Sequence, residues 1–264
     1  MADKLNGENT GMGLIPDKVK KVKKESKKKS TSTETVNYTV KPVTPYRTYI
    51  SPSSLYKARC PRCTWLNYQH NFQIPANLAL QQKLSRLQES FFDNRELSEI
   101  DTNLPKGFSS LKKGKITSKN IFINGQDSGW QFYGELDFIF NYADGSFGVA
   151  DGKVSMKADP SLLAEDYWPQ LQAYAFMLEN NEENPILIKS LGLVRWRIEE
   201  TSQTEEWGFT VSHEYIPIER DDVKFMTFIN DFINVIKGEF PEPDKNCYDC
   251  KWLSKIHYNY GQTS

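Results

Sequence analysis

Residues 134–154 read GELDFIFNYADGSFGVADGKV. Two runs rich in aromatic and β-branched residues flank Ala143-Asp144-Gly145, and this arrangement predicts a β-hairpin. A three-residue loop with glycine at its end suits a hairpin whose last loop residue is left-handed. Tyr142 then lies opposite Ser146, and this register determines the face on which each later side chain lies.

The predicted register brings two acidic residues together. Counting away from the turn places Asp137 directly opposite Asp151. Because side chains alternate along a strand, Asp151 and Lys153 lie on one face. A two-residue Asp144-Gly145 loop would turn Asp137 to the other face, and we adopt the three-residue loop. We therefore expect two carboxylates and one ammonium on a single surface.

These residues are of the types that form a divalent-metal site. Opposed carboxylates repel each other unless a cation lies between them. A hard ion such as Mg²⁺ takes carboxylate and carbonyl oxygens, so we expect Asp137, Asp151 and the carbonyl of Gly152 to be its ligands. Lys153 would hold or help to deprotonate a bound water and offset transition-state charge. An acid-x-lysine triplet is common by itself, so an ordinary surface hairpin is the alternative interpretation.

The bulk composition narrows the class of protein. The 264 residues are 38% hydrophobic and 25% charged, as in a soluble globular protein. No apolar run approaches the roughly 18 residues of a spanning helix, and the N-terminus has no secretory pattern. A cytoplasmic protein with no membrane partner is therefore expected. The G-x-x-x-x-G-K-[ST] and G-x-G-x-x-G motifs are absent, which removes the main support for nucleotide hydrolysis and dinucleotide binding.

The N-terminal residues differ in composition from the rest. Residues 1–40 hold nine lysines against five acidic residues, whereas the whole chain has a net charge of −1. We expect residues 1–44 to be a disordered basic tail and residues 45–264 to form the folded domain. The tail is either a solubilising segment or a non-specific phosphate-binding arm, and a nuclear-import signal is a weaker third interpretation.

Hydrophobic periodicity predicts alternating helices and strands, which indicates an α/β or α+β domain with one sheet. The helix over residues 77–94 carries Leu80, Leu84, Leu87 and Phe91 at helical spacing. We expect a loop over 98–118 and strands over 121–124, 130–141, 147–154, 188–198 and 206–217. We expect the other helices to start at Ser51-Pro52 and lead into Cys60, to span 170–180 with Pro169 at the first position, and to span 221–237.

The four cysteines form two C-x-x-C pairs, Cys60/Cys63 and Cys247/Cys250. Such pairs suit tetrahedral thiolate ligation, and two pairs complete four ligands. A reducing compartment and a metal site explain them better than disulfides do. Zinc and an iron–sulfur cluster both accept four thiolates, and the spacing does not choose between them.

Taken together, three motifs resemble those of a known family. Gly134 to Asp137, Asp151-Gly152-Lys153 and Gln170 to Tyr174 resemble the G-x-x-D, (D/E)-x-K and Q-x-x-x-Y series of RecB-like nucleases in the PD-(D/E)xK superfamily. The resemblance implies a restriction-endonuclease-like core, with a central mixed sheet flanked by helices. It also implies Mg²⁺- or Mn²⁺-dependent hydrolysis of DNA, in repair, recombination or mobile-element processing. Gln170 and Tyr174 share one helix face and would support the substrate or the metal-bound waters.

The resemblance also implies an acid or histidine on a helix, and here the chain departs from the pattern. Residues 77–94 contain no histidine, so Glu89 is our candidate for this ligand, with Asp93 next. A catalytically inactive DNA-binding or partner module that keeps the fold is the alternative function. A helicase or recombination protein is an expected partner besides DNA.

One branch of the family bears on the cysteines. Nucleases similar to the CRISPR spacer-acquisition and AddB types carry a [4Fe-4S] cluster that clasps the chain ends. They usually have one early and three late cysteines, whereas this chain has two and two, with His257 as a weaker substitute ligand. We expect the [4Fe-4S] cluster, with structural Zn²⁺ as the alternative.

Overall fold

The computed structural model describes residues 45, 47–56, 58, 60–72, 79–112, 114–155, 159–200 and 209–260, except for the side chains of residues 200, 209 and 256–260. The expected basic tail, residues 1–44, lies outside this part of the chain, as does the side chain of His257. None of the described helices is long and apolar enough to cross a membrane.

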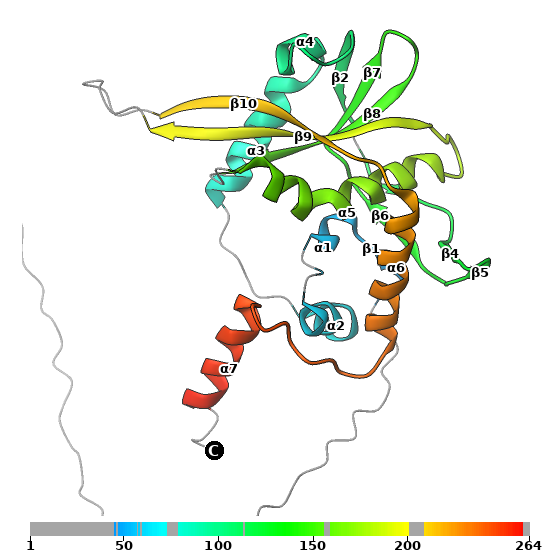
Figure 1. Cartoon of the computed structure of the whole chain (residues 1–264), viewed down its shortest axis with the longest axis vertical. Helices are drawn as coiled ribbons and strands as arrows, with labels where there is room; N and C mark the ends of the chain where they lie inside the picture. Colours follow the sequence, from blue (N-terminus) through cyan, green and yellow to red (C-terminus); the bar gives the residue numbers. More distant parts are fainter. Residues whose placement is uncertain are drawn as a thin grey trace, which may run out of the picture. The chain divides into compact units, whose positions relative to one another are not determined.

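A five-stranded mixed sheet forms the centre of the domain (Figure 1). Its order is β10 (Phe209–Ile218), β9 (Ile188–Glu200), β8 (Phe147–Val154), β7 (Phe138–Tyr142) and β2 (Gly107–Leu111). β8 and β9 are parallel because the long helix α5 (Pro160–Glu179) carries the chain back between them, whereas the other pairs are antiparallel. The predicted mixed sheet flanked by helices is confirmed.

Helices cover both faces of this sheet. α5 packs against β8, β9 and β10, while α3 (Ala79–Phe92) packs against β8 and β2. α6 (Asp222–Lys237) lies against α5 and against α2 (Pro61–His70), which in turn contacts α7 (Tyr248–Tyr260). The remaining short elements are α1 (Pro52–Leu55), α4 (Leu97–Ile100), the strands β1 (Tyr49–Ile50), β3 (Ile116–Thr117) and β6 (Gln131–Gly134) of one small sheet, and the hairpin of β4 (Phe122–Ile123) and β5 (Gln126–Asp127).

The β7–β8 hairpin has the register that its turn predicts. Phe138 pairs with Ala150, and the backbone N–H of Tyr142 donates to the carbonyl of Ser146 at 3.0 Å. Gly145 has a φ of 81°, which is the left-handed conformation expected of the last loop residue. The register extends outward so that Asp137, one residue before β7, faces Asp151.

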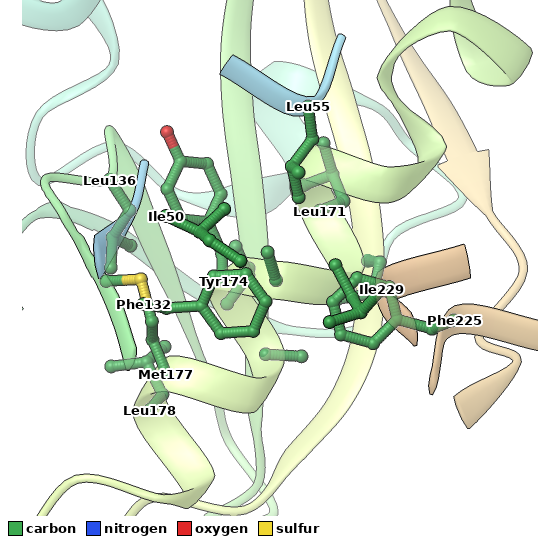
Figure 2. Close-up of a cluster of buried hydrophobic side chains, with 14 of the residues drawn as sticks. Ile50, Leu55, Phe132, Leu136, Leu171, Tyr174, Met177, Leu178, Phe225 and Ile229 are labelled. Carbon is green, nitrogen blue, oxygen red and sulfur yellow. The ribbon is translucent and has the colours of Figure 1, made fainter. Parts of the chain in front are cut away.

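Two hydrophobic cores lie on opposite faces of the sheet. Ile139 and Val149 point toward α5 and belong to the larger core, which also contains Leu171 and Tyr174 (Figure 2). Phe138 and its neighbours on the other face pack against α3 and α4 in the smaller core. Since side chains alternate, Asp137, Asp151 and Lys153 lie on the α5 face of the sheet.

Several expected boundaries were wrong. Residues 98–118, expected to be a loop, contain the end of α4 together with β2 and β3. α5 begins at Pro160 and not at Pro169, because Asp159 caps it by accepting a hydrogen bond from the Ser161 backbone N–H. Pro169 lies inside this helix, where its missing N–H removes one backbone hydrogen bond.

The first helical region also differs from the expectation. The single helix expected from Ser51 is two helices, and the second, α2, starts after Cys60 with Pro61 in its first turn. The apolar face predicted for α3 is only partly buried: Leu84 is buried, but Leu80 is 71% exposed and Leu87 51% exposed. The residues that α3 buries are Leu84, Gln88 and Phe92, because the helix is rotated so that this stripe meets the sheet.

Candidate functional site

The hairpin and α5 assemble the predicted acidic site. Asp151 is fully buried in β8, whereas Lys153 and Asp137 are half-buried. The Lys153 ammonium forms an ion pair with Oδ2 of Asp151. The backbone N–H of Gly152 donates to Oδ2 of Asp137 at 2.8 Å. The structure therefore brings together the four hairpin residues that the sequence singled out.

Burial and neighbouring charges shift the pKa values of Asp137 and Lys153. Burial raises the pKa of Asp137 to about 7, and the nearby Asp151 carboxylate adds to this effect. Burial also disfavours the charged form of Lys153, but Asp151 and Asp137 together outweigh it and raise the pKa of Lys153. Lys153 is therefore an ammonium at neutral pH.

Gln170 and Tyr174 form a buried hydrogen-bonded chain beneath Asp151. The Gln170 amide Nε2 donates to Oδ1 of Asp151 at 2.9 Å and to the Tyr174 hydroxyl at 3.0 Å. The Tyr174 ring packs among the core residues around Phe132 and Leu171 (Figure 2). Burial, with the charges of Asp151 and Asp137, raises the pKa of Tyr174 well above its ordinary value. Both residues are thus placed to orient Asp151.

The two acids expected on the helix take different positions. Glu89 is half-buried on α3; burial raises its pKa, and the charges of Glu135 and Asp151 add to the effect. Asp93 instead accepts a hydrogen bond from the backbone N–H of Leu111 at 3.0 Å, so it holds β2 against the end of α3.

Gln88 of α3 also lies at the hairpin, next to Gly152, and no sequence motif marks it. Its side chain is 1% exposed, and its Nε2 donates to the carbonyl of Val194 at 2.8 Å. Its Oε1 is buried and has no hydrogen-bond partner among the described residues. A Cβ built on Gly152 would lie 2.8 Å from this oxygen and 3.4 Å from Oδ2 of Asp137. A buried amide oxygen without a donor, near the Asp137 carboxylate, is an arrangement that a cation would satisfy.

The four cysteines converge despite their distance in sequence. Their four sulfur atoms all lie within 4.8 Å of one another. Among the described residues, these four cysteines form a group that could hold a metal ion. Cys63 Sγ lies 3.5 Å from both Cys247 Sγ and Cys250 Sγ, and Cys60 Sγ lies 3.6 Å from Cys250 Sγ. All four thiols are free of disulfides.

Each cysteine pair sits at the start of a helix, and hydrogen bonds bring the two starts together. Cys60 caps α2, and Cys247 comes directly before α7. Trp65 of α2 donates to the carbonyl of Gly238 at 3.0 Å, and Arg62 donates to the carbonyl of Pro241 at 2.9 Å. The segment after α6 is thereby fixed along α2. The cysteine group joins the N- and C-terminal regions of the domain.

The pKa values of the cysteine thiols are shifted in different directions. Burial raises the pKa of Cys63 and raises the pKa of Cys250 to about 12. Burial acts on Cys60 in the same direction, but hydrogen bonds from the backbone N–H groups of Cys63 and Asp244 and from the thiols of Cys247 and Cys250 together lower the pKa of Cys60. The Asp244 N–H donates to Cys60 Sγ at 3.4 Å. A bound metal ion would favour the thiolate form of all four.

A comparison with protein families shows to which superfamily the chain belongs. The sequence profile of the PD-(D/E)XK nuclease superfamily matches residues 64–254. The match includes the acidic hairpin, α5 and the second cysteine pair, and it starts one residue after Cys63. A solved structure described as SSO0001 is 17% identical, with a TM-score of 0.45 over 81% of this chain and 85% of that one. No curated protein matches the chain.

Proposed function

Because this chain belongs to the PD-(D/E)XK nuclease superfamily, we propose that it is a divalent-metal-dependent nuclease that hydrolyses phosphodiester bonds in DNA. The observation that carries the proposal is the pairing of Asp137 with Asp151 across the hairpin, with Lys153 on the same face and in ion-pair contact with Asp151. In a domain that needed only stability, two opposed carboxylates, one of them fully buried, would be a cost.

The residues present fit a hard divalent cation. Asp137, Asp151 and the carbonyl of Gly152 would hold Mg²⁺ or Mn²⁺, and Glu89 remains the candidate acid from the helix. The unsatisfied Oε1 of Gln88 supports a further oxygen ligand from α3. When bound, such an ion polarises a phosphate oxygen and lowers the pKa of a water.

The protein's own side chains then have distinct tasks. Lys153, held as an ammonium by two carboxylates, positions the attacking water and offsets charge that develops on the phosphate. Gln170 and Tyr174 are buried, so we assign them to orienting Asp151 and not to touching the substrate. Gln170 fixes one carboxylate oxygen by a hydrogen bond and leaves the other to Lys153.

The cysteine group is proposed to be a structural metal centre. Similarity to the iron–sulfur branch of RecB-like nucleases supports a [4Fe-4S] cluster. The sulfur separations of 3.5–3.6 Å favour the alternative, a single Zn²⁺ ion. Zinc–sulfur bonds of about 2.3 Å place tetrahedral ligands roughly 3.8 Å apart, whereas thiolates on four separate irons need a wider cavity. Iron, sulfide and zinc analysis of anaerobically purified protein distinguishes the two.

A role in DNA repair, recombination or mobile-element processing, with a helicase or recombination partner, is part of the same proposal. Residues 1–44 are proposed to be a basic tail attached to the domain of residues 45–264. If the tail binds phosphate, its deletion should weaken DNA affinity and flatten the dependence on salt. If deletion changes neither the DNA affinity nor its dependence on salt concentration, the tail serves only solubility.

The decisive experiment is a cleavage assay. Purified protein is incubated with labelled single- and double-stranded DNA in Mg²⁺, in Mn²⁺ and in EDTA. We expect metal-dependent products, which Lys153→Ala should form far more slowly than the wild type. Lys189→Ala is the matched control, because Lys189 also pairs with an aspartate, Asp144, at 2.9 Å but is exposed at the other end of the sheet. Absence of cleavage in every metal would favour the inactive DNA-binding or partner module.

A further inference from the structure

An aromatic stack leads outward from the acidic site. The rings of Tyr56 and Tyr167 are stacked, with centroids 4.9 Å apart and planes inclined by 18°. The Lys153 Nζ lies 4.7 Å from the centroid of the Tyr167 ring. Tyr167 projects from α5, and Tyr56 follows α1 directly. The stack therefore begins beside the Lys153–Asp151 ion pair and ends at Tyr56.

The outer ring of the stack is open to a cavity. Tyr56 is 37% exposed, and Tyr167 covers one face of its ring. Tyr56 also lines a cavity of about 890 Å³. Pockets that bury small ligands have volumes of roughly 300–1,000 Å³, so this cavity takes a short piece of one strand and not a duplex.

The cavity that Tyr56 lines also has groups that bind phosphate. It carries Arg47 and the hydroxyls of Ser51 and Ser53. The Arg47 guanidinium lies 4.3 Å from the centroid of the Tyr68 ring and donates through one Nη to Oδ1 of Asn67, which also lines the cavity. The acidic lining residues, Asp244 and Asp249, lie instead at the cysteine end of the cavity. A phosphate is thus favoured at the Tyr56 end.

We propose that Tyr56 is a stacking platform for an unpaired nucleobase of the strand that is cut, with Arg47 holding an adjacent phosphate. The proposal rests on the nuclease function proposed above and defines how that site would receive its substrate. Bases in a duplex are covered on both faces, whereas an unpaired base has a free face to stack on an aromatic ring. A base docked on the open face of Tyr56 is separated from Lys153 by the stacked rings of Tyr56 and Tyr167, so a phosphodiester further along the same strand can reach the acidic site.

Binding of DNA that contains 2-aminopurine tests the proposal, because stacking quenches the fluorescence of this base. The wild-type protein is titrated into single-stranded and duplex oligonucleotides in EDTA, so that no cleavage occurs. Stacking contributes about 1–3 kcal/mol per base, which corresponds to roughly a fivefold to 150-fold change in affinity. We expect Tyr56→Ala to weaken single-strand binding by about tenfold or more and to abolish the quenching, with duplex binding unchanged.

Two further variants separate stacking from general damage. Tyr56→Phe keeps the ring and should bind within about twofold of wild type. Phe122→Ala removes an exposed aromatic residue of β4 that does not line the cavity, and it should have no effect. Thermal melting of each variant verifies that it is folded.

The outcomes separate this proposal from the proposed nuclease activity. Unchanged quenching and affinity in Tyr56→Ala, or equal loss in Tyr56→Phe, would overturn the stacking site even if the wild type cleaves DNA. No single-strand binding by wild type would overturn it as well. Conversely, loss of quenching in Tyr56→Ala alone would support the stacking site even if no metal supported cleavage.

Discussion

The backbone N–H of Gly152 donates a 2.8 Å hydrogen bond to Oδ2 of Asp137. This bond ties the middle of the D-G-K triplet to the acid on the opposite strand. On its α3 side, Gly152 leaves room for the Gln88 amide oxygen. Because Gly152 has no side chain, both Asp137 and Gln88 of α3 can lie close to its peptide group in β8.

We predict that Gly152→Ala disturbs the site through Gln88. The new Cβ would lie 2.8 Å from Gln88 Oε1, so the side chain must move. Overpacking of this kind costs about 1–3 kcal/mol of unfolding free energy, measurable by denaturant titration. In a Gln88→Ala background the same substitution should cost clearly less, and strictly additive effects would contradict the contact.

Lys153→Ala should reduce cleavage by roughly a hundredfold to a thousandfold while leaving DNA binding nearly intact, because its charge acts on the water and the transition state. Asp151→Asn should also stop cleavage, but through loss of the ion. Thermal melting distinguishes them: Mn²⁺ should raise the melting temperature of Lys153→Ala and leave that of Asp151→Asn unchanged. Wild-type rates in both variants would place the activity elsewhere.

The metal-free protein should become more stable as the pH falls from 8 to about 5. The pKa of Asp137 is raised to about 7 in the folded state, against about 3.9 when unfolded. The folded state therefore takes up a proton in this window that the unfolded state does not, and the gain is complete below the unfolded pKa. Melting in EDTA measures it. Asp137→Asn should flatten the rise, and an unchanged profile would argue against a buried Asp137 carboxylate.

Tyr174→Phe should lower stability by about 1 kcal/mol and reduce cleavage, because Gln170 loses an acceptor and holds Asp151 less firmly. Tyr142→Phe is the matched control. The Tyr142 hydroxyl makes a 2.6 Å hydrogen bond with Ser190 near the turn end of the hairpin. Loss of this hydrogen bond should lower the stability of the protein about as much as Tyr174→Phe does, but DNA cleavage should be unchanged. Equal activities of the two variants would leave Tyr174 with a packing role only.

Cys247→Ala should lower the metal content of the protein and its melting temperature, with activity lost only as the domain unfolds. A strong chelator should destabilise the wild type but have no further effect on this variant. Tyr248→Phe, at the exposed neighbouring position, should behave like wild type. Folded wild-type protein without iron or zinc would contradict ligation by the four cysteines.

Local sequence features predicted the parts of the fold that local chemistry controls. The Ala143-Asp144-Gly145 turn was sufficient to predict the register of the hairpin, and hence the shared face of Asp137 and Asp151. The two C-x-x-C spacings were sufficient to predict that the four cysteines converge. The hydrogen bonds from α2 to the segment after α6, which bring the two pairs together, could not be predicted from the sequence around the cysteines.

The parts that the sequence did not predict depend on distant partners. Gln88 is buried because Val194, 106 residues later, accepts its amide hydrogen bond, and no helical periodicity marks such a residue as internal. Leu80 and Leu87 fit an apolar stripe but remain exposed. The stacking of Tyr56 on Tyr167 likewise joins residues whose proximity follows only from the packing of α1 on α5.

The cysteine centre has a consequence for the integrity of the chain. Cys60 and Cys250 are 190 positions apart, so a metal bound by the four cysteines would close nearly the whole domain into one loop. A backbone cut between β9 and β10 would leave one C-x-x-C pair on each fragment. The ion would then hold the two pieces together as a bridge between separate polypeptides, and a chelator would release them.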